Sequence, residues 1–181
     1  MHYILYYVKI IYMKSIIKLY IFIAVILFGD EPPVIMTLRN IISNDSIIFS
    51  YHQHYFNCYP YGIIALEKLL TDEKTSSTCK KIYFDFSQKY PKLHFFAHYH
   101  FHLEQNYVLD LHKEGCIVFS KGKKSYSEVL LEHGLAIINP KVKNEEYMLY
   151  FFAAQERAKR ARKGLWGDPD MRKCKAELLR Q

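Results

Sequence analysis

Short apolar runs, broken by polar clusters, occupy the first half of the chain and predict strands. Residues 34–49 contain two such runs, which the polar cluster Ser43-Asn44-Asp45 separates. Residues 55–59 form a third run that is rich in aromatic side chains. Because apolar runs of this length between turn signals are typical of strands, we predict three consecutive strands over residues 34–59.

The pattern then changes to helical spacing. Leu66, Leu69 and Leu70 recur along one helical face, which predicts a helix that begins near Ala65. Residues 71–78 are polar and are expected to form a loop.

A second apolar periodicity follows the loop. Ile82, Phe86 and Tyr90 recur every fourth residue, so a helix ending at Pro91 is expected. Residues 93–105 suggest a further helix. Together these segments predict a helical insertion around residues 71–105.

The second half of the chain predicts a hairpin and two helices. Residues 107–111 and 116–120 flank a short turn. Ser125 and Glu128 have the spacing of a capping box, and Gly134 supplies the left-handed residue that ends that helix.

A longer helix comes next. Asn144 is expected to cap this helix, and Gly164 is expected to end it. One face of the helix carries Tyr147, Phe151, Ala154 and Ala158. We expect Leu165 and Trp166 to fold back as an apolar plug, and residues 167–181 to form a loosely held polar tail.

The order of elements predicts the fold class. Three strands, a helix, two strands, a short helix and a long helix are arranged as in an OB-type barrel. We therefore predict an α+β protein, mainly a five-stranded Greek-key barrel with helices packed at one end. The domain is expected to span residues 30–166.

The N-terminal segment has a composition of its own. Residues 1–29 contain Lys9, Lys14, Lys18 and no acid, and residues 19–29 are uncharged. This pattern is typical of a secretory signal peptide, with Met13 as an alternative start. The uncharged run is shorter than the roughly 20 residues of a membrane-spanning helix. We expect a periplasmic or secreted protein; a retained N-terminal anchor is the alternative, because Leu27 is unfavourable for cleavage.

Charge and cysteine content leave two questions open. The chain carries a formal net charge of +7, with an excess of basic residues over 141–181. Such a stripe can attract polyanions or simply form a solvated helix face.

The chain has four cysteines and no CxxC pair, which disfavours zinc; they are Cys58, Cys79, Cys116 and Cys174. They form one or two disulfides in an exported protein, or remain buried thiols.

Two ordered motifs in the second half resemble a known family. Residues 127–136 (SEVLLEHGLA) resemble the pattern N-E-x-L-v-x-x-G-L-A, and residues 153–166 resemble A-E-x-x-A-K-x-x-K-x-G-L-W. Both patterns are those of thermonuclease (staphylococcal-nuclease-like) domains. The resemblance implies an OB-type fold, calcium as cofactor and cleavage of DNA or RNA.

The resemblance also assigns candidate site residues. Asp45 falls on a calcium-binding aspartate, and Glu67 falls on the catalytic glutamate that activates water. Tyr59 stands where the family has its first catalytic arginine, and Ile64 replaces the second calcium-binding aspartate. The second arginine has only Lys113, or the neighbouring histidine, as a substitute.

The resemblance places two cysteines on neighbouring strands of the barrel. It therefore implies a disulfide between Cys58 and Cys116, whose Cα atoms could approach the ~5.5–6 Å that a bridge needs.

Other side chains are candidate ligands. His94, His98 and His102 recur every fourth residue and on one helix could bind zinc, copper or nickel. The more ordinary interpretation is an amphipathic helix with histidines at its polar border. Tyr55, Tyr59 and Tyr61 are candidates for stacking on bases, whereas Trp166 is better explained by packing.

Two functional hypotheses follow. The first is an exported, calcium-dependent hydrolase of DNA or RNA with a weakened catalytic set. The second is a catalytically inactive binding or structural module of the periplasm or envelope that kept the fold. In either case we expect a monomer.

Overall fold

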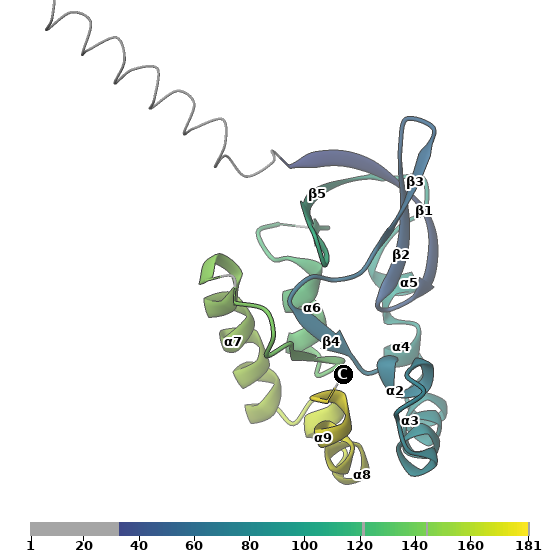
Figure 1. Ribbon diagram of the computed structural model, residues 1–181, viewed down its shortest axis with the longest axis vertical. Coiled ribbons are helices and arrows are strands. Elements are labelled where there is room, and N and C mark those ends of the chain that lie inside the picture. The colour runs from purple at the N-terminus through teal and green to yellow at the C-terminus, as the bar shows by residue number, and fades with distance from the viewer. Residues whose placement is uncertain (1–32, 121, 144, 181) are drawn as a thin grey trace, which may run out of the picture. The chain divides into compact units, whose positions relative to one another are not determined.

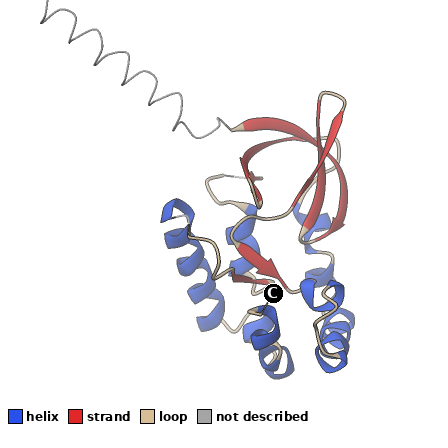
Figure 2. Ribbon diagram, in the orientation of Figure 1, coloured by secondary structure: helices blue, strands red, loops and turns tan. Residues whose placement is uncertain are grey.

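The computed structural model describes residues 33–120, 122–143 and 145–180 (Figure 1). The predicted signal peptide over residues 1–29 and the predicted cap at Asn144 lie outside the described residues. Within the described part, strands and helices are both abundant, and the five-stranded sheet and most of the helices lie at opposite ends (Figure 2). The predicted α+β class is confirmed.

The main sheet contains five antiparallel strands. They are β1 (Val34–Ser43), β2 (Ser46–Tyr51), β3 (His54–Cys58), β5 (Asn106–His112) and β6 (Gly115–Phe119). Their order across the sheet is β3-β2-β1-β5-β6. The three predicted N-terminal strands and the predicted hairpin are confirmed. Leu38, Ile47, Phe49 and Leu109 are fully buried on the inner face, which explains the alternation in the sequence.

The two edge strands of this sheet, β3 and β6, meet at a single point. The Tyr61 backbone NH donates to the Cys116 carbonyl (3.0 Å), and the Cys116 NH donates to the Tyr59 carbonyl (2.9 Å). A disulfide joins Cys58 to Cys116, with 5.6 Å between their Cα atoms. Because no ladder joins the two edges over the described residues, a closed barrel is not confirmed.

A small second sheet replaces the start of the predicted helix. β4 (Ile63–Ala65) pairs antiparallel with β7 (Ala136–Ile138), and the helix α2 (Lys68–Thr71) begins only afterwards. The prediction of a helix from Ala65 is wrong by three residues, because the backbone of residues 63–65 pairs with a strand more than seventy residues away.

The insertion contains one long helix and two short ones. α3 (Ser77–Lys89) is capped by Ser76, whose hydroxyl accepts from the Cys79 NH, and it ends before Pro91 as predicted. α4 (Pro91–His94) and α5 (Phe96–His100) follow. The prediction of one helix over 93–105 is wrong, because α5 ends at His100, residues 103 and 104 form a turn, and residues 104 and 105 hydrogen-bond to the backbone of β1.

The C-terminal helices pack on the small sheet. α6 (Tyr126–Glu132) has the predicted capping box between Ser125 and Glu128. α7 (Glu145–Arg160) buries the predicted face, and the 3-10 turn η1 (Gly164–Trp166) follows it. Leu165 is fully buried, and its NH donates to the Gly134 carbonyl (2.9 Å).

Gly134 gives a testable consequence of this packing. Its φ is +66°, and a Cβ would lie 2.1 Å from the Lys163 carbonyl oxygen. We expect Gly134→Ala to lower the free energy of unfolding by about 3 kcal/mol, because backbone strain and a backbone clash add. Gly122 is the matched control, since its φ is +77° but a Cβ there would meet nothing within 4 Å. Urea unfolding of the two variants would contradict this account if they lost equal stability.

The last described residues form two short helices instead of a loosely held polar tail. α8 (Pro169–Lys173) and α9 (Lys175–Leu178) bury Met171, Cys174 and Leu178 completely. A disulfide joins Cys174 to Cys79 of α3, with 5.6 Å between the Cα atoms. Within the described residues, no helix has the length and apolar character needed to cross a membrane.

Candidate functional site

A small hollow, here called the Asp45 hollow, opens beside β4 and α2. Its volume is about 200 Å³. It is lined by Asp45, Tyr59, Pro60, Gly62, Ile63, Ala65, Lys68, Glu114, Asn139 and Val142. It thus combines Asp45 with Tyr59, which replaces a family arginine, but Glu67 and Lys113 are not among its lining residues.

Asp45 lies in the tight turn between β1 and β2. The Ser43 hydroxyl donates to Asp45 Oδ1 (2.7 Å), and Lys68 Nζ lies 4.0 Å from Asp45 Oδ2. The Lys68 ammonium also lies 5.5 Å from the centre of the Tyr59 ring. The nearest cation to Asp45 is therefore a lysine of the protein itself.

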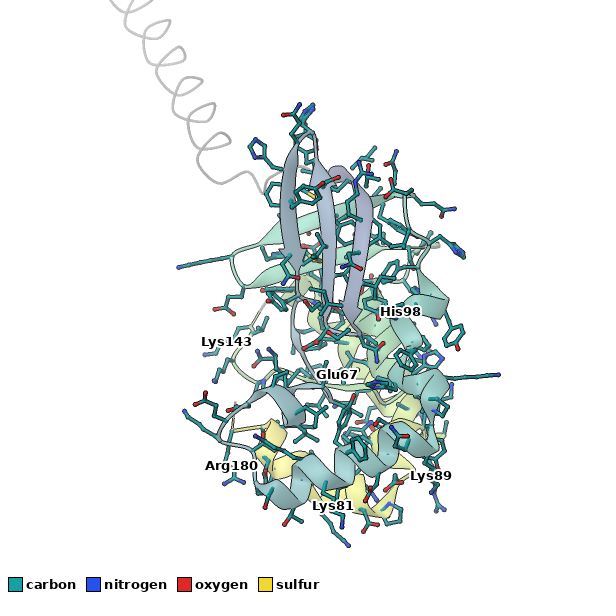
Figure 3. All side chains as sticks on the ribbon, turned by 90° about the vertical axis from the view of Figure 1, so that its right-hand side faces the viewer. Glu67, Lys81, Lys89, His98, Lys143 and Arg180 are labelled. Atoms are coloured by element: carbon teal, nitrogen blue, oxygen red, sulfur yellow. A yellow bond between two sulfur atoms is a disulfide. The ribbon has the colours of Figure 1, made fainter. Side chains whose placement is uncertain are left out.

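Glu67 is held in a buried polar contact, between the sheet and the insertion (Figure 3). Asn44 Nδ2 donates to Glu67 Oε1 (2.5 Å) and to the Leu93 carbonyl (2.9 Å). The Ala97 NH in turn donates to Asn44 Oδ1 (2.8 Å). Asn44 thereby connects Glu67 to residues 93–97 of the insertion.

This environment changes the ionisation of Glu67. Burial, with a smaller contribution from the charge of Asp45, raises the pKa of Glu67 to about 8. The Glu67 backbone NH and the Asn44 and Tyr83 side chains oppose this rise only in part. Burial also raises the pKa of Tyr83 and of Tyr126. At neutral pH Glu67 is thus mostly a neutral acid, and a neutral acid cannot accept a proton from water.

Lys113 lies at a different hollow, between β3 and the β5–β6 hairpin. This hollow has a volume of about 460 Å³, and Phe56, Leu109 and Leu111 make much of its lining apolar. His112 is stacked on Tyr61, with 4.0 Å between ring centres, and its Nε2 lies 3.2 Å from Asp110 Oδ2. Neither residue therefore brings a cation to the Asp45 hollow.

The donor set at Asp45 does not fit calcium. Calcium takes six to eight oxygen ligands, several of them carboxylates. Asp45 already faces the Lys68 ammonium, and Glu67 is engaged by Asn44. Throughout the part of the chain that the structure describes, no three His, Cys, Asp or Glu side chains form a group that could hold a metal ion.

The histidine-rich segment does not form a single ligand face. His94 ends α4, His98 lies in α5, and His102 follows α5 in extended chain. Their rings contact aromatic side chains, as between His94 and Tyr83 or His98 and Phe95. This arrangement agrees with the interpretation as packing at a polar border.

The stacking candidates differ in exposure. Tyr55 is 71% exposed and Tyr59 is 45% exposed, whereas Tyr61 is partly buried against His112. Trp166 packs beneath Lys159 and Lys175, whose ammonium groups lie 5.1 and 5.5 Å from its ring centre. Only Tyr59 of these lies at the Asp45 hollow.

A third hollow, here called the cationic hollow, adjoins the Asp45 hollow and shares Ile63, Lys68 and Asn139 with it. Its volume is about 440 Å³. The remaining lining residues are Ile64, Thr71, Asp72, Lys74, Lys141 and Arg180. The sequence indicated a basic C-terminal region but gave no sign that residues 68, 74 and 180 would meet.

The comparison with protein families bears on the second half of the chain. Residues 106–168 match the family model of staphylococcal nuclease homologues. The resemblance to thermonucleases is thereby confirmed over this segment, and it supports a nuclease-like or nucleic-acid-binding function. No curated protein matches the chain. Lys113 lies inside the matched segment, whereas Asp45 and Glu67 lie before it.

Proposed function

We propose that this protein is an exported thermonuclease-fold module that binds nucleic acid and does not carry out calcium-dependent hydrolysis of its backbone. The observation that carries the proposal is the position of Glu67. Its carboxyl group lies in a buried contact with Asn44 and does not line the hollow that contains Asp45 and Tyr59.

The missing charges support the same proposal. Phosphodiester cleavage needs preorganised positive charge where the transition state becomes negative, and removal of one such group costs roughly 10²–10³ in rate. Arginine supplies this charge as a rigid bidentate fork. The Asp45 hollow contains no arginine, and its lysine faces Asp45.

The disulfides support export. Cys58–Cys116 and Cys79–Cys174 are both bonded, and disulfides persist mainly in oxidising compartments. Together with the predicted signal peptide over residues 1–29, they favour the periplasm or the extracellular space as the place of action.

A calcium-dependent nuclease is the second candidate. One observation favours it: Asp45 and Glu67 keep their family positions, and the charge of Asp45 is near enough to raise the pKa of Glu67. In this candidate Asp45 would be the metal ligand, and Glu67, released from Asn44, would be the general base.

A cleavage assay separates the two candidates. The oxidised protein is incubated with single- and double-stranded DNA and with RNA, with calcium or with a chelator. We expect no calcium-dependent cleavage above background, and identical results for wild type and Glu67→Gln. Glu73→Gln serves as the matched control, because Glu73 is exposed on the loop before α3. Calcium-dependent cleavage that is lost in Glu67→Gln and kept in Glu73→Gln would overturn the proposal.

A further inference from the structure

We infer that the cationic hollow is the contact surface for a single strand of nucleic acid, with phosphates at its lysine and arginine side chains and a base on Tyr59. The inference rests on the proposed function and specifies where and in which form nucleic acid binds. It concerns a surface that lies largely outside the matched segment, since residues 68, 74 and 180 precede or follow residues 106–168.

The charge of the cationic hollow fits a polyanion. Four of its lining residues are Lys or Arg and only Asp72 is acidic, so its formal charge is +3 (4 − 1). Lys68 pairs with Asp45 and Arg180 pairs with Glu177, each at 4.0 Å. The Lys68 and Arg180 side chains remain 45% and 74% exposed. Because the energy of such an exposed pair is small, phosphate can compete with the carboxylate partners of Lys68 and Arg180.

The hollow is also built on a rigid support. Arg180 lies two residues after α9, and Glu177 of α9 hydrogen-bonds to the cap of α3. Glu177 accepts from the Ser76 NH (2.9 Å) and from the Ser76 hydroxyl (2.7 Å). The Cys79–Cys174 disulfide strengthens this connection, because Cys79 is three residues after Ser76 and Cys174 is three residues before Glu177. The backbone that carries Arg180 is thus tied to the cap of α3, and a preorganised backbone lowers the ordering entropy lost on binding.

The lining of the neighbouring Asp45 hollow favours single-stranded over duplex nucleic acid. Asp45 and Glu114 line it, and these carboxylates repel phosphate. Its exposed aromatic side chain, Tyr59, offers instead a surface on which a base can stack. Because Lys68 lines both hollows, a strand can place a phosphate at Lys68 and its base at Tyr59. A base within a duplex is not available for such stacking, so a single strand is favoured.

The test measures binding of a fluorescein-labelled oligothymidylate by anisotropy at 50 and 200 mM salt, using the full oxidised chain. The variant of the cationic hollow, here called the hollow variant, is Lys74→Ala with Arg180→Ala. The matched control is Lys81→Ala with Lys89→Ala, which removes the same charge from α3. Figure 3 shows Arg180 and Lys89 on opposite sides of the helical region, with Lys81 along α3.

We expect the hollow variant to bind about tenfold more weakly. The slope of the logarithm of its binding constant against the logarithm of the salt concentration should fall in magnitude by about 1.4, the value for two lost phosphate contacts to a single strand. The control is expected to change affinity less than about twofold. Tyr59→Leu should weaken binding about tenfold without a change in salt slope, since stacking releases no counterions. Thermal unfolding followed by circular dichroism verifies that each variant is folded.

The possible failures are distinguishable. Equal losses in the hollow and control variants would overturn this inference and leave the proposed function intact. Equal affinity for the oligothymidylate alone and for the same strand annealed to its complement would do the same. Absence of binding by the wild-type protein at 50 mM salt would overturn the proposed function itself and this inference with it.

Discussion

At pH 8 the Glu67→Gln variant is expected to be more stable than the wild-type protein by about 3–5 kcal/mol, whereas at pH 4 the two should differ little. The cause is the pKa of Glu67, which burial raises from 4.5 to about 8. One pKa unit corresponds to about 1.4 kcal/mol of difference between folded and unfolded states. Glutamine keeps the carbonyl that accepts from Asn44 but carries no ionisable group.

The direction of the effect follows from proton binding. Between pH 4.5 and 8 the unfolded chain ionises Glu67 while the folded protein retains the proton. Wild-type stability therefore falls as the pH rises through this window, and the full penalty is present above pH 8. The neutral glutamine escapes this penalty, so the gap between the two proteins widens with pH.

Urea unfolding at pH 4, 6 and 8 measures this gap. Glu73→Gln is again the control, because its exposed carboxyl group should produce no widening. A constant difference between Glu67→Gln and wild type at all three pH values would show that Glu67 is ionised in the folded protein. The proposed loss of its role as a base would then lose its main support.

Removal of the Cys79–Cys174 disulfide is expected to lower the free energy of unfolding by about 4 kcal/mol. The bridge spans 95 residues of sequence, and closure of so long a loop restricts the unfolded chain strongly. The double variant Cys79→Ala with Cys174→Ala removes it without leaving a reactive thiol from this pair. Unfolding in urea, compared with the oxidised wild type, gives the loss directly.

The second disulfide provides the matched control. Cys58→Ala with Cys116→Ala removes a bridge over 58 residues at the junction of β3 and β6. Both variants should lose similar stability, but only the first should make residues 169–180 sensitive to limited proteolysis under native conditions. Equal protection of this segment in both variants would mean that the buried Met171 and Leu178 hold it without the bridge.

The parts of the fold that depend on local signals could be predicted from the sequence. The polar cluster at residues 43–45, the capping box at Ser125 and the left-handed Gly134 all determine backbone conformation within a few residues. The β4–β7 sheet could not be predicted, because two three-residue strands carry no periodicity and pair across a long separation. The C-terminal helices had a usable signal, since residues 171, 174 and 178 lie at helical spacing.

The candidate site was predictable only as a set of positions. The family resemblance located Asp45 and Glu67 in the chain, but it could not give the direction of the Glu67 side chain. That direction depends on Asn44 and on its hydrogen bonds to residues 93–97, which belong to an insertion distant in sequence. The meeting of Lys68 with Arg180 likewise depends on how α9 packs against α2 and bonds to Ser76, the cap of α3.

The side-chain amide of Asn44 is also a point of chemical vulnerability that its burial protects. Amides are thermolabile, and hydrolysis of this one would turn the group that donates to Glu67 and to the Leu93 carbonyl into a carboxylate that faces two acceptors. Asn44 is only 1% exposed, so water reaches its amide mainly when the turn before β2 opens. The burial of Asn44 in this turn therefore links the chemical durability of the amide to the local stability of the turn.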